Sequence, residues 1–142
     1  MTVELLAALI VIALGCVQVV LQAAEYRRVH GVAYANSALD QPSAAPDSLL
    51  LGRLTRALRN LHETLPFFLG LVVILALMDV STPVSRAAAV VFAGARVVYL
   101  PLYAMGIPYL RGMVWMVAFV AMIVLLVVAL GAADWSVLTG AA

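Results

Sequence analysis

The sequence is poor in charge and has no lysine at all. Of its 142 residues, 11% are charged and 66% are hydrophobic, whereas a soluble domain is about a quarter charged and about half apolar. This composition excludes a soluble enzyme, a nucleic-acid-binding protein and a disordered tail. The eight basic residues are all arginine, the side chain best suited to planar, bidentate contacts with carboxylates.

Cysteine and histidine are scarce as well. Because Cys16 stands alone, neither an internal disulfide nor a thiolate cluster can form, and its apolar neighbours favour a small buried hydrophobe. The two histidines, His30 and His62, have no carboxylate at metal-ligand spacing, so we expect no metal site. Nucleophile elbow, P-loop and dinucleotide-binding motifs are also missing.

Long apolar runs dominate what remains. A membrane-spanning helix needs about 20 apolar residues, and the sequence predicts helices over about residues 3–28, 48–78, 83–105 and 109–138. We therefore predict an all-α membrane protein, with residues 1–142 forming a single four-transmembrane-helix up-down bundle. The first run has no positively charged start and is too long for a cleavable signal peptide, so we expect it to be retained.

Local signals mark the ends of these helices. Asp47 or Ser48 can cap the second helix, and Pro66 is expected to kink it. Thr82 is the expected N-cap of the third helix, with Pro83 in its first turn. The segment 35–47 is rich in serine and proline and predicts an irregular loop.

The arginines also predict the orientation in the membrane. Arg27, Arg28 and Arg53 flank the first loop, and Arg111 follows the last turn. By the positive-inside rule these connections are cytoplasmic. We expect an integral, multi-pass protein with both termini on the non-cytoplasmic side, in a bacterial inner membrane.

A stripe of polar residues follows one face of the second helix. At about 100° per residue, five polar side chains share an arc of about 120°: Arg53, Arg56, Arg59, Asn60 and Glu63. The opposite arc holds Ala57, Leu58, Leu61 and Leu65. Arg53 and Arg56 fit either interfacial anchoring or a ligand site.

Glu63 lies too deep for the interface. An unpartnered carboxylate inside the membrane costs several kcal/mol. Arg96, in the middle of the third helix, has nearly the same depth. We therefore predict a Glu63–Arg96 ion pair.

Two tyrosines and a further arginine extend the polar region. Tyr99 and Tyr103 share the helix face of Arg96, and they fit either an aromatic belt or a site lining. Arg111 stands at the start of the fourth helix, where unpaired amides and the helix dipole favour an anion. Such a pocket suits a small molecule with several negative groups and one amine, such as glutathione.

These motifs resemble those of one family, the membrane-associated proteins in eicosanoid and glutathione metabolism (MAPEG). The resemblance lies first in Arg53-Leu-Thr-Arg56-Ala-Leu-Arg59-Asn60-Leu-His-Glu63-Thr-Leu-Pro66. It continues in Ala95-Arg96-Val-Val-Tyr99-Leu-Pro-Leu-Tyr103 and in Gly106-Ile-Pro-Tyr-Leu-Arg111. It implies a homotrimer that binds glutathione between subunits near the cytoplasmic side and takes a lipophilic small-molecule substrate from the lipid bilayer.

The resemblance also implies roles for individual residues. The glutathione contacts would be Arg28, Arg56, Arg59, Asn60, Glu63, Tyr99 and Tyr103, and Arg111 would stabilise the thiolate. The implied activity is that of a glutathione-dependent transferase or peroxidase, with no metal. Two departures, Gly112 in place of a Ser or Thr and Trp115 in place of a tyrosine, leave an alternative open: a non-enzymatic lipid-binding protein that does not use glutathione.

Overall fold

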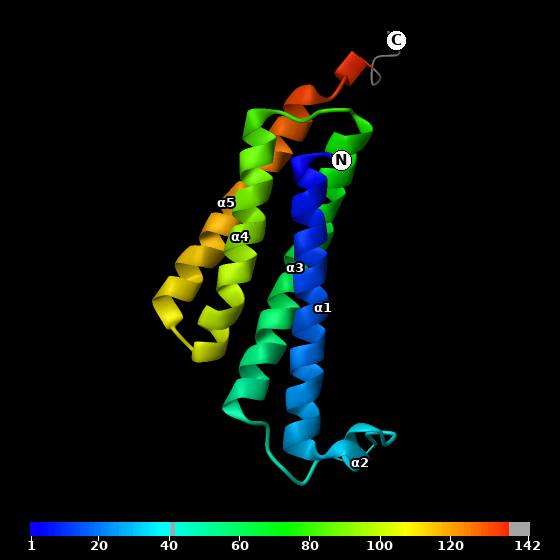
Figure 1. Cartoon of the computed structure of the whole chain (residues 1–142), viewed down its shortest axis with the longest axis vertical. Coiled ribbons are helices and arrows are strands. Elements are labelled where there is room, and N and C mark those ends of the chain that lie inside the picture. Colours follow the sequence, from blue (N-terminus) through cyan, green and yellow to red (C-terminus); the bar gives the residue numbers. More distant parts are fainter. Residues whose placement is uncertain (41, 137–142) are drawn as a thin grey trace.

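The computed structural model describes residues 1–40 and 42–136 and is built from helices. In chain order these are α1 (Val3–His30), α2 (Val32–Ala35), α3 (Leu49–Leu77), α4 (Pro83–Met105) and α5 (Pro108–Ala132). The four long helices run alternately down and up the bundle (Figure 1). All four are long and apolar enough to cross a membrane, so the predicted all-α, four-transmembrane fold is confirmed.

The helix starts follow from local capping. Ser48 Oγ accepts a hydrogen bond from the Leu51 N–H at 3.0 Å, so Ser48 rather than Asp47 caps α3. Thr82 caps α4 and forms a reciprocal capping box with Ser85, which satisfies two N–H groups that the helix leaves unpaired. Pro83 occupies the first turn of α4, as predicted.

The last helix is shorter than predicted. It ends at Ala132 rather than at about residue 138, and residue 138 itself lies outside the described residues. Ala133 is extended, with φ −68° and ψ 137°, and the Asp134 carboxylate accepts the Ser136 N–H at 2.9 Å. A short polar side chain that bonds nearby backbone competes with the helix, which explains the early end.

The bundle is held together by close packing of α1 on α3 and α4 and of α4 on α5. The rings of Phe68 and Phe92 stack with their centroids 4.0 Å apart. Three alanines of α4, Ala88, Ala89 and Ala93, are buried, and their small side chains let the helix backbones approach closely. Most other large apolar side chains of α1 and α5 point outward, as suits helices that face lipid.

Cys16 belongs to that outward-facing surface. The interpretation of Cys16 as a buried hydrophobe is wrong for the single chain, because its side chain is exposed beside the exposed Val17 and Val19. An apolar run on a membrane helix is solvated by lipid, so hydropathy alone does not distinguish the lipid-facing side from the core.

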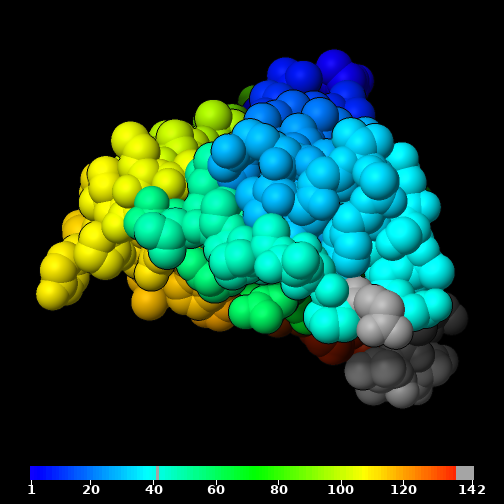
Figure 2. All heavy atoms as spheres, turned by 90° about the horizontal axis from the view of Figure 1, so that it is seen from below, coloured from blue at the N-terminus to red at the C-terminus, as the bar shows by residue number. Residues whose placement is uncertain are grey.

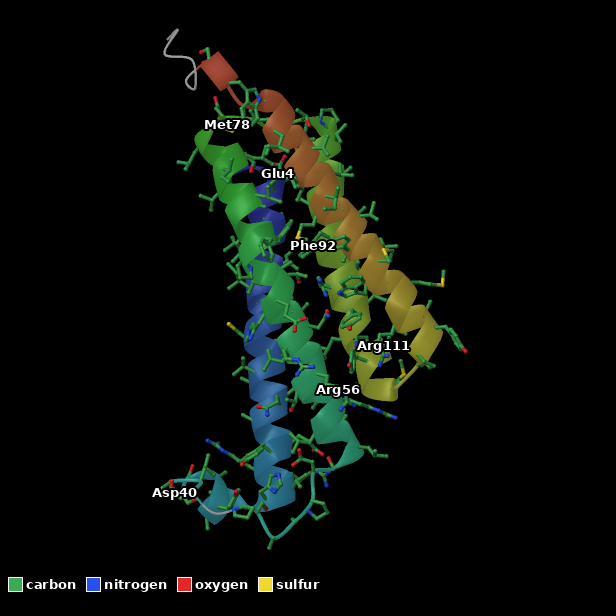
Figure 3. The ribbon with its side chains drawn as sticks, turned by 180° about the vertical axis from the view of Figure 1, so that it is seen from behind. Glu4, Asp40, Arg56, Met78, Phe92 and Arg111 are labelled. Atoms are coloured by element: carbon green, nitrogen blue, oxygen red, sulfur yellow. The ribbon has the colours of Figure 1, made fainter. Side chains whose placement is uncertain are left out.

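A buried acid joins the first helix to the start of α4. Glu4 is 2% exposed, and its carboxylate accepts hydrogen bonds from the hydroxyls of Ser81 and Ser85. Glu4 and Met78 lie near one end of the bundle, and Arg56 and Arg111 lie toward the other (Figure 3).

The opposite end of the bundle brings α3 close to the α4–α5 turn. Figure 2 views this end along the bundle axis and shows the turn beside the first part of α3. Arg53 Nη1 donates to the Ala104 carbonyl at 3.1 Å, and Gly106 ends α4 in the left-handed region with φ 77°. The positive φ of Gly106 favours glycine at this position, and a Cβ there would also force the Arg53 guanidinium to shift.

Candidate functional site

The polar stripe predicted on the second helix lies on one face of α3. Opposite it, Ala57 and Leu61 are each 1% exposed and pack inward. Arg56 is exposed, and the side chains of Arg59 and Glu63 are 74% and 60% exposed. Charged side chains in a membrane-spanning helix avoid lipid, so this face must meet water, a ligand or another protein surface.

Arg59 and Glu63 form a loose pair on that face, with Arg59 Nε 3.7 Å from Glu63 Oε1. They border an open groove of about 440 Å³ that is lined by Thr55, Leu58, Arg59, His62 and Glu63. Exposed ion pairs one helical turn apart contribute little to stability. The pair therefore leaves both groups free to rearrange around a ligand.

The two tyrosines of α4 lie inside the bundle, against the inward side of α3. Tyr99 and Tyr103 are 6% and 8% exposed, and their rings meet edge to face with centroids 5.3 Å apart. They pack on Ala57 of α3 and on Trp115 of α5. The structure therefore brings these predicted site residues together with α3 in one contiguous cluster.

Arg111 closes the cluster from α5. Its guanidinium carbon lies 4.5 Å from the centroid of the Tyr103 ring, close enough for a cation–π contact. Helix α5 begins at Pro108, and its N-cap Ile107 provides no side-chain hydrogen bond. The free N–H groups of this first turn and the Arg111 side chain together favour a negative charge nearby.

Arg96 does not make the predicted ion pair with Glu63. It is 1% exposed, with Nη1 donating to Asn60 Oδ1 at 2.8 Å and Nη2 donating to Thr64 Oγ1 at 2.7 Å. The prediction matched the depths of Glu63 and Arg96 but not the rotation of α3. Glu63 precedes Thr64 by one residue and therefore points about 100° away from it around the helix.

Arg28 is already paired within the chain. Its Nε and Nη2 donate to the two carboxylate oxygens of Glu25 at 2.7 and 2.6 Å, and Ser48 Oγ donates to the same carboxylate at 2.7 Å. This cluster lies at the start of α3, about 12 Å along the helix from Arg56. The chain by itself therefore does not bring Arg28 together with the polar face of α3.

Two polar residues near the candidate site, Thr64 and Trp115, were not predicted to contribute to it. Thr64, which anchors Arg96, stands four residues after Asn60 and so lies on the same side of α3; this spacing was the available signal. The Trp115 indole N–H is buried and has no hydrogen-bond partner among the described residues. Whether a buried N–H meets an acceptor depends on tertiary packing, which leaves no signature in the sequence.

His30 is held by two contacts with the loop between α2 and α3. Its Nδ1 lies 2.7 Å from Ser43 Oγ and its Nε2 lies 2.9 Å from Asp47 Oδ1. Over residues 1–40 and 42–136, the structure contains no group of three or more histidine, cysteine, aspartate or glutamate side chains able to hold a metal ion. The short contacts of His30 order the connection between α2 and α3.

An apolar groove runs along a different face, between α4 and α5. It has a volume of about 800 Å³, and its lining includes Val84, Val91, Met113, Met116 and Val120. No polar side chain lines it. A groove of this composition accommodates hydrocarbon and offers no hydrogen bond to fix a polar ligand.

Comparisons with known proteins give one match. The model of the MAPEG family matches residues 5–131, a range that contains the polar face of α3, both tyrosines and Arg111. No curated protein and no solved structure matches the chain significantly.

Proposed function

The chain belongs to the MAPEG family, and from this premise we propose that it is a membrane-bound, glutathione-dependent transferase or peroxidase. The family comprises membrane proteins of glutathione-related function, including transferases, peroxidases and non-enzymatic members. The proposed reactions use the glutathione thiolate against lipophilic electrophiles or lipid hydroperoxides. We place both termini on the non-cytoplasmic side of a bacterial inner membrane, so that the site opens to cytoplasmic glutathione.

The observation that carries this proposal is the exposed polar face of α3. Arg56, Arg59 and Asn60 offer hydrogen-bond donors there, and the face also carries Glu63, with which Arg59 is only loosely paired. Glutathione has two carboxylates, two amides and one ammonium group. The arginines suit the carboxylates through paired hydrogen bonds, and Glu63 suits the ammonium.

The same face supports assembly as a homotrimer. Lipid cannot solvate exposed guanidinium and carboxylate groups, so a second copy of the chain is proposed to cover the face and enclose the ligand. In that arrangement Arg28 of one copy, 68% exposed while bonded to Glu25, could reach the ligand of the next copy. The site is thus proposed to be complete only between subunits.

The proposed chemistry needs no nucleophile from the protein. A free thiol is only a few per cent ionised at neutral pH, so stabilising the thiolate raises the rate directly. Arg111 and the N–H groups at the start of α5 are placed to do this. A lipophilic electrophile entering from the bilayer, with the apolar α4–α5 groove as one route, would meet the thiolate at close range.

The direct test is activity of detergent-purified protein with glutathione and either an aryl halide or a lipid hydroperoxide. Arg111→Ala should lower turnover about 100-fold or more while glutathione still binds. The ultraviolet absorbance of the thiolate should appear on adding glutathione to the native protein and vanish in Arg111→Ala. Arg86→Ala, an exposed arginine near the start of α4, is the matched control and should behave like the native protein. Unchanged turnover in Arg111→Ala would remove Arg111 from the mechanism.

One observation favours a second candidate, a lipid-binding protein that does not use glutathione. Gly112 leaves the position after Arg111 without a hydroxyl group. In that case purified protein would bind a lipophilic ligand, show no thiolate absorbance and turn over neither substrate. The absorbance measurement thus separates the two candidates.

A further inference from the structure

Arg96 is a buried cation that the proposed reaction leaves without a role. Its two hydrogen-bond acceptors, Asn60 and Thr64, are neutral. Its guanidinium carbon also lies 5.2 Å from the Phe92 ring centroid and 5.7 Å from that of Tyr99. Keeping a guanidinium in the membrane interior is costly, and the hydrogen bonds to Asn60 and Thr64 offset part of that cost.

The bond from Arg96 fixes the orientation of the Asn60 amide. A guanidinium has donors and no acceptor, so the Asn60 atom that faces it must be Oδ1, as observed at 2.8 Å. The Asn60 NH₂ group is therefore turned away from Arg96. It is absent from the buried, unpaired atoms of the described chain and stays accessible on the polar face of α3.

Thr64 fixes Arg96 in turn. The Thr64 hydroxyl lies 3.3 Å from the Asn60 carbonyl and 3.2 Å from the Leu61 carbonyl, so its proton is directed to the backbone. Its lone pair accepts from Arg96 Nη2 at 2.7 Å. The two terminal nitrogens of the guanidinium are thus bonded to α3 residues one helical turn apart. A compact ammonium cannot reproduce this fork.

We propose that Arg96 is a positioning residue that holds Asn60 with its NH₂ group toward the ligand, so that Asn60 donates to a carboxylate or peptide carbonyl of glutathione. This inference rests on the proposed function, because it assigns a donor role within the same site. Without Arg96 the amide rotates freely, and half of its orientations present an oxygen to the acceptor. Arg96 touches neither substrate and acts only through Asn60.

The test is a double-mutant cycle on glutathione affinity. Arg96→Lys should raise the KM and the Kd for glutathione about three- to tenfold, the worth of one well-placed hydrogen bond, with kcat at saturating glutathione unchanged. In an Asn60→Ala background, the same substitution should change the Kd less than about twofold. Arg86→Lys, the same exchange at an exposed site on α4, is the control. An equal effect of Arg96→Lys in both backgrounds, or a fall in kcat alone, would overturn the positioning role.

A second pair of variants covers the case in which Arg96→Lys does not fold. Thr64→Val removes only the second anchor of Arg96 and should raise the Kd in the same direction. Asn60→Asp keeps an oxygen toward Arg96 but exchanges the NH₂ for a second oxygen, so affinity should fall about tenfold or more while the melting temperature holds. Native affinity in Asn60→Asp would exclude the donor role.

A ligand-free measurement separates this inference from the proposed function. Melting temperatures of the native, Arg96→Lys, Asn60→Ala and double-variant proteins report the Arg96–Asn60 bond itself. The inference is supported if the effects of the Arg96 and Asn60 substitutions are coupled both in melting temperature and in the Kd for glutathione. Glutathione binding without either coupling overturns the inference and leaves the function standing. Coupled melting in a protein that binds no glutathione overturns the function and, with it, the ligand role of Asn60.

Discussion

The Glu4 end of the bundle and the polar face of α3 both contain charged groups, and the two regions differ in whether those charges are satisfied within the chain. At one end the Glu4 carboxylate is buried and accepts hydrogen bonds from two serine hydroxyls beside a complete capping box. On the polar face of α3, Arg56, Arg59 and Glu63 are exposed, and Arg59 and Glu63 form a loose pair with 3.7 Å between them. A satisfied buried charge holds helices together, whereas unsatisfied charges on a membrane helix call for a ligand or a partner.

The largest expected effect is a loss of stability at the Glu4 end of the bundle. Ser85→Ala removes a donor to buried Glu4 and half of the capping box, and we expect it to lower the free energy of unfolding by about 2–3 kcal/mol. Melting in detergent measures this. Activity per folded molecule should stay at the native value, because the site is at the far end.

Ser81→Ala is the matched control for that variant. Ser81 also donates to Glu4 but is exposed and takes no part in the capping box, so its loss should cost less than half as much. Equal losses for both serines would mean that the capping box contributes nothing.

The second effect falls on the polar face of α3. Arg56→Gln should lower glutathione affinity about tenfold, because a charge-assisted contact to a carboxylate is lost. The melting temperature should not change, since the side chain is exposed. Binding by calorimetry and melting in detergent test both statements, with the exposed Arg27→Gln at the end of α1 as control. A large fall in melting temperature with native affinity would make Arg56 structural.

The smallest expected effect is a change in turnover and stability at Gly112, next to Arg111. Gly112→Ser places a hydroxyl beside Arg111, and an added Cβ meets no atom within 4 Å. We expect turnover to rise a few-fold if the hydroxyl reaches the thiolate, and stability to rise by about 0.5 kcal/mol because glycine is a poor helix former. Gly70→Ser, which also has open space but lies on α3 away from Arg111, should change stability alone.

The parts of the molecule that follow from short stretches of sequence were predicted well. Four apolar runs gave four membrane-spanning helices. Thr82 and Pro83 start α4 as expected, because a cap bonds residues only two or three positions away. The end of the last helix was placed too late, since the hydropathy of 133–138 carried no sign of the turn at Asp134.

The contacts between helices were predicted less well. The Glu63–Arg96 pair was inferred from equal depth, but the rotation of α3 against α4 decides that Asn60 and Thr64 meet Arg96. A rotation of about 100° separates neighbouring residues on a helix, so matching depth leaves the partner open. Glu4 could not be matched to Ser85, which is 81 residues away in the sequence.

Hydropathy and helical periodicity are local properties, and they suffice to identify a helical membrane protein with a polar face on its second long helix. Which of its few charged side chains find a partner within the chain depends instead on how the helices pack. Glu4, Glu25 and Arg96 find hydrogen-bond partners there, while Arg56 stays exposed on α3. A hydrogen bond requires its two heavy atoms within about 3 Å in a set orientation, and the packing of the helices fixes both.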